Sequence, residues 1–264
     1  MTAVAGLPGM VGNETRKGLL VMWSHKATLA PQLGMMAATY LAIQFFIGGG
    51  RIVDALLPQT LIAYLAYVVG YIALMRMAAG VLEEMNTGTF EQSLLSPLRP
   101  WVLSVGRLGA ALAEGLLIGL AVTVVFVPLL DIGIAWRWQA LIPIALTLAD
   151  IAGFALLIGG LAITVNSIGA IIHVISGVVM LLNGGMVPVS AYPVWLEVLA
   201  RCVPTTLGMD ATRRILFFDQ TLGDVWADGT LAWAVLHASV MLLTGWAVYA
   251  GNVARGLRDG RLGP

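Results

Sequence analysis

Long apolar stretches alternate with short polar segments along this chain. A helix needs about 20 apolar residues to cross the hydrocarbon core of a bilayer. Six stretches have about this length or more: 33–50, 57–80, 101–130, 139–165, 167–187 and 231–254. The pattern predicts an all-α integral membrane protein with six transmembrane helices. An even number of spans places both ends of the chain on the same side of the membrane.

The segment before the first apolar stretch has a mixed pattern. Residues 14–30 combine apolar and basic side chains, namely Leu19, Leu20, Met22, Trp23, Arg16, Lys17 and Lys26. This combination predicts an amphipathic helix along the inner membrane interface, within an interfacial segment at 1–32. A cytoplasmic extension of the first span is the alternative. Residues 1–13 carry no charge, and a cleaved signal peptide opens with a basic region, so we expect no cleavage.

The segment at 188–230 is too polar and too often interrupted by proline to cross a membrane. Residues 194–203 and 207–218 nevertheless each carry an apolar face. We expect short helices that re-enter the outer leaflet, where protein or water must satisfy the backbone. The alternative, an ordinary exposed loop, would leave large apolar side chains in water: Trp195, Leu196, Leu199, Phe217 and Phe218.

The polar segment at 83–99, between the second and third apolar stretches, carries signals for the start and end of a helix. Thr89 and Gln92 have the spacing of a capping box. Glu91 lies in the first turn, where the helix dipole favours an anion. Pro97 restricts the residue before it to extended backbone, which ends the helix. The sequence therefore predicts a helix of about two turns.

The predicted short helix presents a small apolar surface. Phe90 and Leu94 are four residues apart and so share one face, with the carboxylate of Glu91 beside them. A short helix with an apolar face suits a groove on another protein. We therefore expect this segment to dock onto a partner.

Two stretches of the chain resemble the permease subunits of the ATP-binding-cassette type-2 exporter family. The coupling segment of that family shows a Glu, then Gly-Thr-apolar-Glu, then Ser/Thr-Pro, which here is Glu84, Gly88-Thr89-Phe90-Glu91 and Ser96-Pro97. The family's external segment before the last span resembles 184–190, 192–196, 203–204 and 209–213. The two resemblances have the expected order and distance, and together they extend over nearly the whole chain.

The resemblance implies a partner and a site. In this family the coupling segment contacts an ATPase subunit, present in two copies, which binds the ATP and Mg, so that no cofactor is expected in this chain. A second permease subunit completes the transporter as a homodimer or a heterodimer. The residues expected to couple the ATPase to transport are Glu83, Glu84, Gly88, Thr89, Phe90, Glu91, Leu94 and Pro97.

Composition supports a membrane protein independently. Hydrophobic residues make up 59% of the 264 residues and charged residues 11%, and the mean hydropathy is +0.91, far from the balance of a soluble domain. We expect a single transmembrane permease domain over 1–264. Within it lie the cytoplasmic interfacial segment at 1–32, the coupling segment at 83–99 and the external segment at 188–230.

The distribution of basic residues predicts the orientation, because basic residues that flank spans are retained in the cytoplasm. The side of the chain ends has nine: Arg16, Lys17, Lys26, Arg76, Arg99, Arg107, Arg255, Arg258 and Arg261. The opposite side has five: Arg51, Arg137, Arg201, Arg213 and Arg214. We therefore expect a multi-pass protein of the cell membrane with both termini and the coupling segment in the cytoplasm.

Several classes of protein are excluded or disfavoured. A phosphate-binding loop needs Gly-Lys-Ser/Thr, but Lys17 follows Arg16 and Lys26 follows His25, so we expect ATP hydrolysis in a separate subunit and no enzyme here. An intramembrane metalloprotease would need Arg in place of Gly88, and the two span histidines have no second ligand at metal-binding spacing. Cys202 is alone and forms no internal disulfide. A net charge of zero gives no support for nucleic-acid binding.

Two acids lie within predicted spans, where ionisable groups are costly and so are candidates for function. Glu114 and Asp150 are candidates for lining a substrate path. In the structural alternative, Glu114 pairs with a neighbouring span or with Arg107, and Asp150 accepts a hydrogen bond from a helix neighbour.

These observations favour the permease subunit of an ATP-driven exporter that works by alternating access. Its cargo would be an amphipathic or hydrophobic molecule such as a drug, an antibiotic or a lipid. Membrane lipid therefore counts among the expected partners. An exporter of lipid-linked glycan or polysaccharide is the alternative. A membrane scaffold without a transport path is a third class, but a scaffold does not need a coupling segment.

Overall fold

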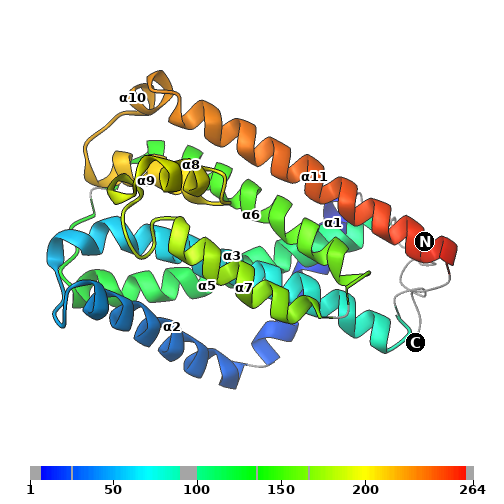
Figure 1. Ribbon diagram of the computed structural model, residues 1–264. Coiled ribbons are helices and arrows are strands. Elements are labelled where there is room, and N and C mark those ends of the chain that lie inside the picture. The colour runs from blue at the N-terminus through cyan, green and yellow to red at the C-terminus, as the bar shows by residue number, and fades with distance from the viewer. Residues whose placement is uncertain (1–6, 25, 90–99, 135, 166, 260–264) are drawn as a thin grey trace.

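The computed structural model describes residues 7–24, 26–89, 100–134, 136–165 and 167–259, and these residues form helices and turns without a strand. Figure 1 shows the arrangement. The long helices are α1 (Leu7–Ser24), α2 (Lys26–Ile47), α3 (Leu57–Asn86), α5 (Pro100–Leu129), α6 (Leu141–Ala162), α7 (Ile168–Leu182) and α11 (Thr230–Asp259). Shorter ones are the 3-10 helices η1 (Asp54–Leu56), η2 (Trp138–Ala140) and η3 (Val189–Ala191), and α8 (Val194–Arg201), α9 (Thr206–Phe217) and α10 (Leu222–Ala227). The predicted all-α class is confirmed.

Five helices in the described part of the chain, within α2, α3, α5, α6 and α11, are long and apolar enough to cross a membrane. The predicted fifth span, at 167–187, is shorter than expected. Its helix α7 has 15 residues, which is about 22 Å against a hydrocarbon core of about 30 Å. The helix stops because the Asn183 side chain donates to the carbonyl of Ala63 on α3 (3.0 Å) and accepts from the N–H of Gly185 (2.9 Å). Gly184 then adopts a φ of +86°, which favours glycine.

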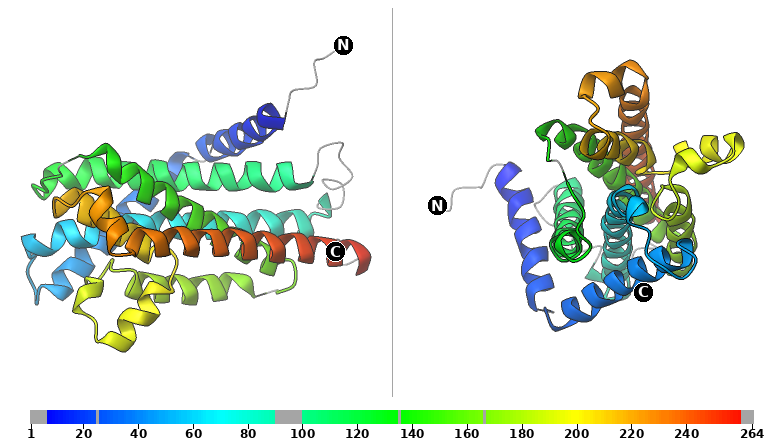
Figure 2. Two further views of the ribbon diagram at one scale, coloured as in Figure 1. Left: turned by 90° about the horizontal axis from the view of Figure 1, so that it is seen from above. Right: turned by 90° about the vertical axis from the view of Figure 1, so that its left-hand side faces the viewer.

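The connections lie at two ends of the bundle. The last turns of α3 and α11 and the first turns of α5 lie at one end, and α1 begins toward the same end (Figures 1 and 2). The α2–α3 turn, η2 and residues 183–229 occupy the other end. The first and last described helices therefore have their outer ends on one side, as an even number of passes predicts.

Helix α3 is the centre of the bundle and contacts α2, α5, α6, α7 and α9. Its buried face packs against α2 partly through hydroxyl groups. The Tyr64 hydroxyl donates to the carbonyl of Met36 (2.7 Å), and the hydroxyls of Tyr40 and Thr60 lie 3.2 Å apart. Tyr40 also packs against Phe126 of α5, with ring centroids 5.3 Å apart. Aromatic side chains thus fill the space between three spans while keeping their hydroxyls paired.

Helices α6 and α11 approach each other backbone to backbone. A Cβ added to Gly153 would lie 2.3 Å from the carbonyl carbon of Met241, and one added to Gly245 would lie 2.0 Å from the oxygen of Gly153. About two turns further along both helices, Asn252 donates to the carbonyl of Gly160 (2.9 Å). Small residues at an interface allow close packing where the hydrophobic effect does not drive helix association.

Helix α1 differs from its predicted boundaries. The amphipathic helix was expected over 14–30, but α1 ends at Ser24 and a second helix begins at Lys26. It is also no extension of the first span, because it crosses α5. In the view down the bundle α1 is seen from the side while α5 is seen end-on (Figure 2, right). The crossing is close, since a Cβ on Gly106 would lie 2.4 Å from Cβ of Glu14 and one on Gly18 would lie 2.4 Å from Cβ of Ala110.

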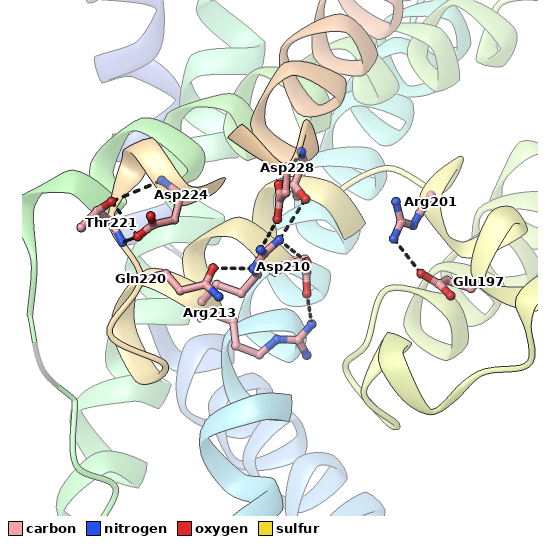
Figure 3. Close-up of polar contacts among 10 residues, drawn as sticks. Glu197, Arg201, Asp210, Arg213, Gln220, Thr221, Asp224 and Asp228 are labelled. Atoms are coloured by element: carbon pink, nitrogen blue, oxygen red, sulfur yellow. Dashed lines mark hydrogen bonds and ion pairs between the residues drawn. The ribbon is translucent and has the colours of Figure 1, made fainter. Parts of the chain in front are cut away.

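The external segment contains the predicted short helices, and they differ in burial. Helix α9 packs against α3 and α6 at the end of the bundle opposite the last turns of α3 and α11 (Figure 1). Gly208 allows close contact with Thr147 there. Helix α8 has an exposed apolar side, including Val194 (78% exposed) and Trp195 (66% exposed). Ion pairs stabilise the remainder of the segment at 188–230 (Figure 3). Arg213, which is buried, donates to Asp210 (2.6 Å) and to the carbonyl of Gln59 on α3 (3.1 Å).

The turn between α9 and α11 is fixed by two further sets of contacts. Arg214 donates to Gln220 (2.7 Å), to Thr230 (2.9 Å) and to Asp228. Helix α10 begins with a capping box in which Thr221 and Asp224 bond to each other's backbone N–H. The backbone N–H and hydroxyl of Thr221 both donate to this carboxylate and lower the pKa of Asp224.

The close approach of α6 and α11 leads to a first prediction. Gly245→Ala places a methyl group against the oxygen of Gly153 and should destabilise the protein by about 1–3 kcal/mol, the usual cost of overpacking. The matched control is Gly251→Ala on the same helix, where nothing lies within 4 Å of the added Cβ. Unfolding of the purified protein in micelles, measured by tryptophan fluorescence, should show a lower midpoint for Gly245→Ala alone. Equal midpoints for the two variants would contradict the packing.

Candidate functional site

The predicted coupling segment begins on the last turn of a span. Helix α3 continues to Asn86, so Glu83 and Glu84 belong to it and not to a separate loop. Thr87 closes the helix with its backbone N–H on the carbonyl of Glu83 (3.0 Å). Gly88 has a φ of +67°, the left-handed conformation in which many helices end and which favours glycine. The chain therefore leaves α3 in a direction that the residue at 88 sets.

Thr89 is the last described residue of this segment. Its hydroxyl lies 2.8 Å from the hydroxyl of Thr87 and 3.5 Å from the carbonyl of Glu84. The remaining predicted coupling residues, Phe90, Glu91, Leu94 and Pro97, lie outside the described residues. The predicted two-turn helix therefore stays a prediction, and so do the roles of these residues.

Glu84 has a partner within the chain. Arg107 of α5 donates from Nη2 to the Glu84 carboxylate. The Arg107 side chain is 21% exposed and the Glu84 side chain is 29% exposed. The stem of Arg107 lies over Gly80, one turn earlier on α3, because a Cβ there would be 3.1 Å from Cδ and Nε of the arginine. Glycine at 80 thus leaves room for Arg107 to lie along α3 and reach Glu84.

A second ion pair joins the same two helices about two turns further into the bundle. Arg76 of α3 donates from Nε to Oε2 of Glu114 (2.8 Å) and from Nη2 to Oε1 (2.5 Å). Glu114 is buried, at 5% exposed, whereas half of the Arg76 side chain is exposed. A bidentate pair of this kind fixes geometry as well as charge. Each helix contributes one arginine and one glutamate, so a shift of α3 along α5 would bring like charges together. The two pairs therefore specify the register of α3 against α5.

Asp150 lies in a different place and has different partners. Its Oδ2 accepts from the backbone N–H of Thr205 (2.8 Å), and its Oδ1 lies 3.0 Å from Nδ1 of His237 on α11. The other ring nitrogen of His237 lies 3.0 Å from the carbonyl of Cys202. A carbonyl only accepts hydrogen bonds, so the contact with Cys202 requires a proton on Nε2 of His237. The group ties α6 and α11 to the start of α9.

Thr205 needs such a partner. It has a φ of +79°, an uncommon conformation for a non-glycine residue, and as the N-cap of α9 it has no acceptor for its N–H within that helix. Asp150 therefore satisfies a buried N–H that no helix bond would satisfy. Whether Asp150 or Glu114 also lines a substrate path stays a prediction, but each carboxyl oxygen of the two acids already has one partner within the protein.

Comparison with known proteins gives the family. A sequence model of the ABC-2 type transporter family matches residues 14–217. The chain belongs to this family. The matched range contains the α1 crossing, both ion pairs between α3 and α5, and the external segment through α9. The resemblance in the coupling and external segments is thereby confirmed at the level of the family.

Two curated relatives of this ABC-2 transporter chain come from Escherichia coli, strains K12 and O157:H7. Each is described as a probable multidrug ABC transporter permease YbhR, and each is 33% identical over 181 residues. The alignment includes 64% of this chain and 45% of each relative. The chain therefore matches just under half of the length of these relatives.

Some residues of the candidate site in this transporter chain were not apparent from the sequence. Arg76 and His237 are the partners of the two predicted acids, and no spacing rule connects residues on different helices. A third group is aromatic: Tyr67 and Tyr71 of α3 stack with ring centroids 6.1 Å apart, and His173 of α7 lies 6.0 Å from Tyr71. The i, i+4 spacing of the two tyrosines is the signal in the sequence that places them on one face.

The ion pair at the coupling end leads to a second prediction. Glu84→Gln and Arg107→Gln should each destabilise the protein, and the double variant should be no worse than the more damaging single one, with a coupling energy of about 1 kcal/mol. Denaturant titration in mixed micelles measures this energy. The exchange Glu84→Arg with Arg107→Glu serves as a further control and should recover part of the loss. Simple additivity of the two single effects would show that the residues act independently.

Proposed function

We propose that this chain is the membrane-spanning subunit of an ATP-driven exporter and that two such subunits work with two ATPase subunits. The ATPases bind ATP and Mg, and their closure moves the segment at 83–99. That movement tilts the spans and gives the cargo access to alternate sides of the membrane. The observation that carries the proposal is the pair of ion pairs that join α3 to α5, within a chain of the ABC-2 type transporter family.

The two ion pairs support this mechanism. A segment that transmits a movement must be connected to rigid elements. The helices on either side of the segment at 83–99, α3 and α5, are joined by the ion pairs Glu84–Arg107 and Arg76–Glu114. Helix α3 in turn packs against α6, α7 and α9. A displacement of the segment therefore acts on a paired unit of two spans, and through α3 on the external segment.

A second permease subunit is supported by the size of the internal space. The cavity between α3, α6 and α7, which Tyr67, Phe154 and Ser176 help to line, has a volume of about 20 Å³. Pockets for drug-sized molecules have volumes of about 300–1,000 Å³. This cavity cannot hold such a cargo, and a larger pocket of about 590 Å³ lies at one end of the bundle, between η1 and the end of α5, and not among the spans. We therefore place the path between two copies of the chain.

The proposed cargo is an amphipathic or hydrophobic molecule. Support comes from the word multidrug in the description of the two relatives and from the aromatic group of Tyr67, Tyr71 and His173 on α3 and α7. Export of a lipid-linked glycan is the alternative that the same architecture allows. The relatives are matched over less than half of their length, so cargo and partners belong to the proposal.

The charge distribution supports the proposed orientation. The coupling end has nine Lys and Arg residues in the sequence, and the opposite end has five. Orientation follows the number of basic residues near the span ends, and acids contribute little. The excess of basic residues therefore favours a cytoplasmic coupling end.

Cysteine labelling tests the orientation. On a Cys202→Ser background, Gly223→Cys on α10 should react with an impermeant maleimide added to intact cells. Asn86→Cys, at the exposed end of α3, should react only after permeabilisation. Both positions are exposed, so reactivity reports the side of the membrane. The opposite pattern would reverse the orientation and remove the docking role of the 83–99 segment.

The coupling role is tested with the ATPase partner. Phe90→Ala removes the largest apolar anchor of the segment, and loss of a buried aromatic at an interface costs about 2 kcal/mol or more. Glu91→Lys reverses the charge that faces the partner and should cause the larger loss. The measurements are pull-down of the ATPase, ATP hydrolysis and cargo efflux in reconstituted vesicles. Phe218→Ala, an exposed aromatic at the opposite end, is the matched control. Normal binding and efflux in both coupling variants would refute the assignment.

A further inference from the structure

Helix α1 has a face on which Arg16, Lys17 and Leu20 are exposed among the residues that the structure describes. Its other face packs on α5 through Glu14, Thr15 and Gly18, and the Thr15 hydroxyl donates to the carbonyl of Gly106 (3.2 Å). The exposed face contains a shallow depression lined by Asn13, Arg16, Lys17, Leu20, Val21 and Ser24. It therefore combines two cationic side chains with exposed apolar ones, of which Leu20 is 57% exposed.

The depth of this face in the membrane follows from helix lengths. Asp54 and Asp131 are exposed and lie just beyond the neighbouring ends of α3 and α5, and we take them as the outer boundary of the hydrocarbon core. A core of about 30 Å corresponds to about 20 helical residues, so the inner boundary lies near residue 74 on α3 and residue 111 on α5. Helix α1 crosses α5 at 106–110. Its exposed face is therefore at the level of the lipid headgroups.

The cationic groups on this face have little compensation from the protein. Within the part of the chain that the structure describes, no carboxylate lies at ion-pair distance from Arg16. The ammonium of Lys17 lies 3.7 Å from Glu14, but the Lys17 side chain is 73% exposed, and exposed pairs at this spacing contribute little. Two positive charges thus point to the headgroup layer, with Leu20 between them on the helix surface.

We propose that this face of α1 binds the headgroup of an anionic phospholipid, with Arg16 and Lys17 on the phosphate and Leu20 among the first acyl carbons. The arrangement matches basic and apolar groups to the two parts of one lipid at the depth where both parts lie. A groove on a partner protein would be matched less well, since exposed apolar residues at this depth face lipid. The site does not depend on the cargo or on the ATPase.

Lipid retention by the purified chain tests the proposal. Phosphatidylglycerol and phosphatidylcholine with the same acyl chains are supplied in equal amounts in mixed micelles, and the bound lipids are counted by native mass spectrometry. The wild type should prefer phosphatidylglycerol, and the preference should fall as salt is raised. Each basic residue removed, in Arg16→Gln and in Arg16→Gln with Lys17→Gln, should lower the preference about fivefold. Arg16→Lys should retain it.

The matched control is Arg51→Gln, which removes an exposed arginine at the opposite end of the bundle and should leave the preference unchanged. An unchanged elution profile and unfolding midpoint in phosphatidylcholine establish that each variant is folded. Wild-type preference in the double variant would overturn the proposal, and so would an equal loss in Arg51→Gln. Loss of ATPase pull-down with unchanged lipid preference would also overturn it and would assign the face to a protein partner.

Discussion

Within a bilayer, a polar or charged group must find its partner in the protein, and this constraint explains where the ionisable residues of the chain lie. Glu114 is paired bidentately with Arg76, and Asp150 is held between Thr205 and His237. Each of these contacts joins two or three helices that are distant in the sequence. The cost of burying a charge therefore becomes a means of specifying which helices are neighbours and in which register.

Close helix packing depends on the same constraint. Helices α6 and α11 meet through Gly153, Gly160 and Gly245, and α1 meets α5 through Gly18 and Gly106. Backbones that come this close leave no space for side chains between them, so directional contacts such as Asn252 to the carbonyl of Gly160 can form. The bundle thus contains three closely joined pairs: α6 with α11 and α1 with α5 meet through glycines, and ion pairs join α3 with α5.

This division bears on transport by a member of the ABC-2 family. The coupling segment emerges from the pair that is held by Glu84–Arg107 and Arg76–Glu114, while the external segment is anchored through Asp150 to α6 and α11 and through Arg213 to α3. Helix α3 is the element common to both anchors. In the proposed mechanism, movement of the segment at 83–99 therefore reaches the opposite end of the bundle through α3, without rearrangement of the α6–α11 pair.

The sequence by itself determined the membrane class, the positions of five of the six predicted spans, the short helices at 188–230 and the family, because hydropathy over 20 residues and a local motif depend only on neighbours in the chain. It missed the end of α7 at Leu182, the six residues by which α3 extends beyond the predicted span, and the crossing of α1 over α5. Asn183 shows why: its helix ends because the side chain binds a carbonyl on α3, and hydropathy does not report that contact.

Contacts between helices also explain which residues of the candidate site could be predicted from the sequence and which could not. Glu84 stands out in the sequence as part of the motif of the coupling segment, and Glu114 and Asp150 stand out because carboxylates are costly within a span. Their partners Arg107, Arg76 and His237 do not, since each lies 23 to 87 residues away and meets its acid only after the helices have packed. Local pattern determined which residues require a partner, and only tertiary structure decided the partner, because the pairing depends on which helices become neighbours.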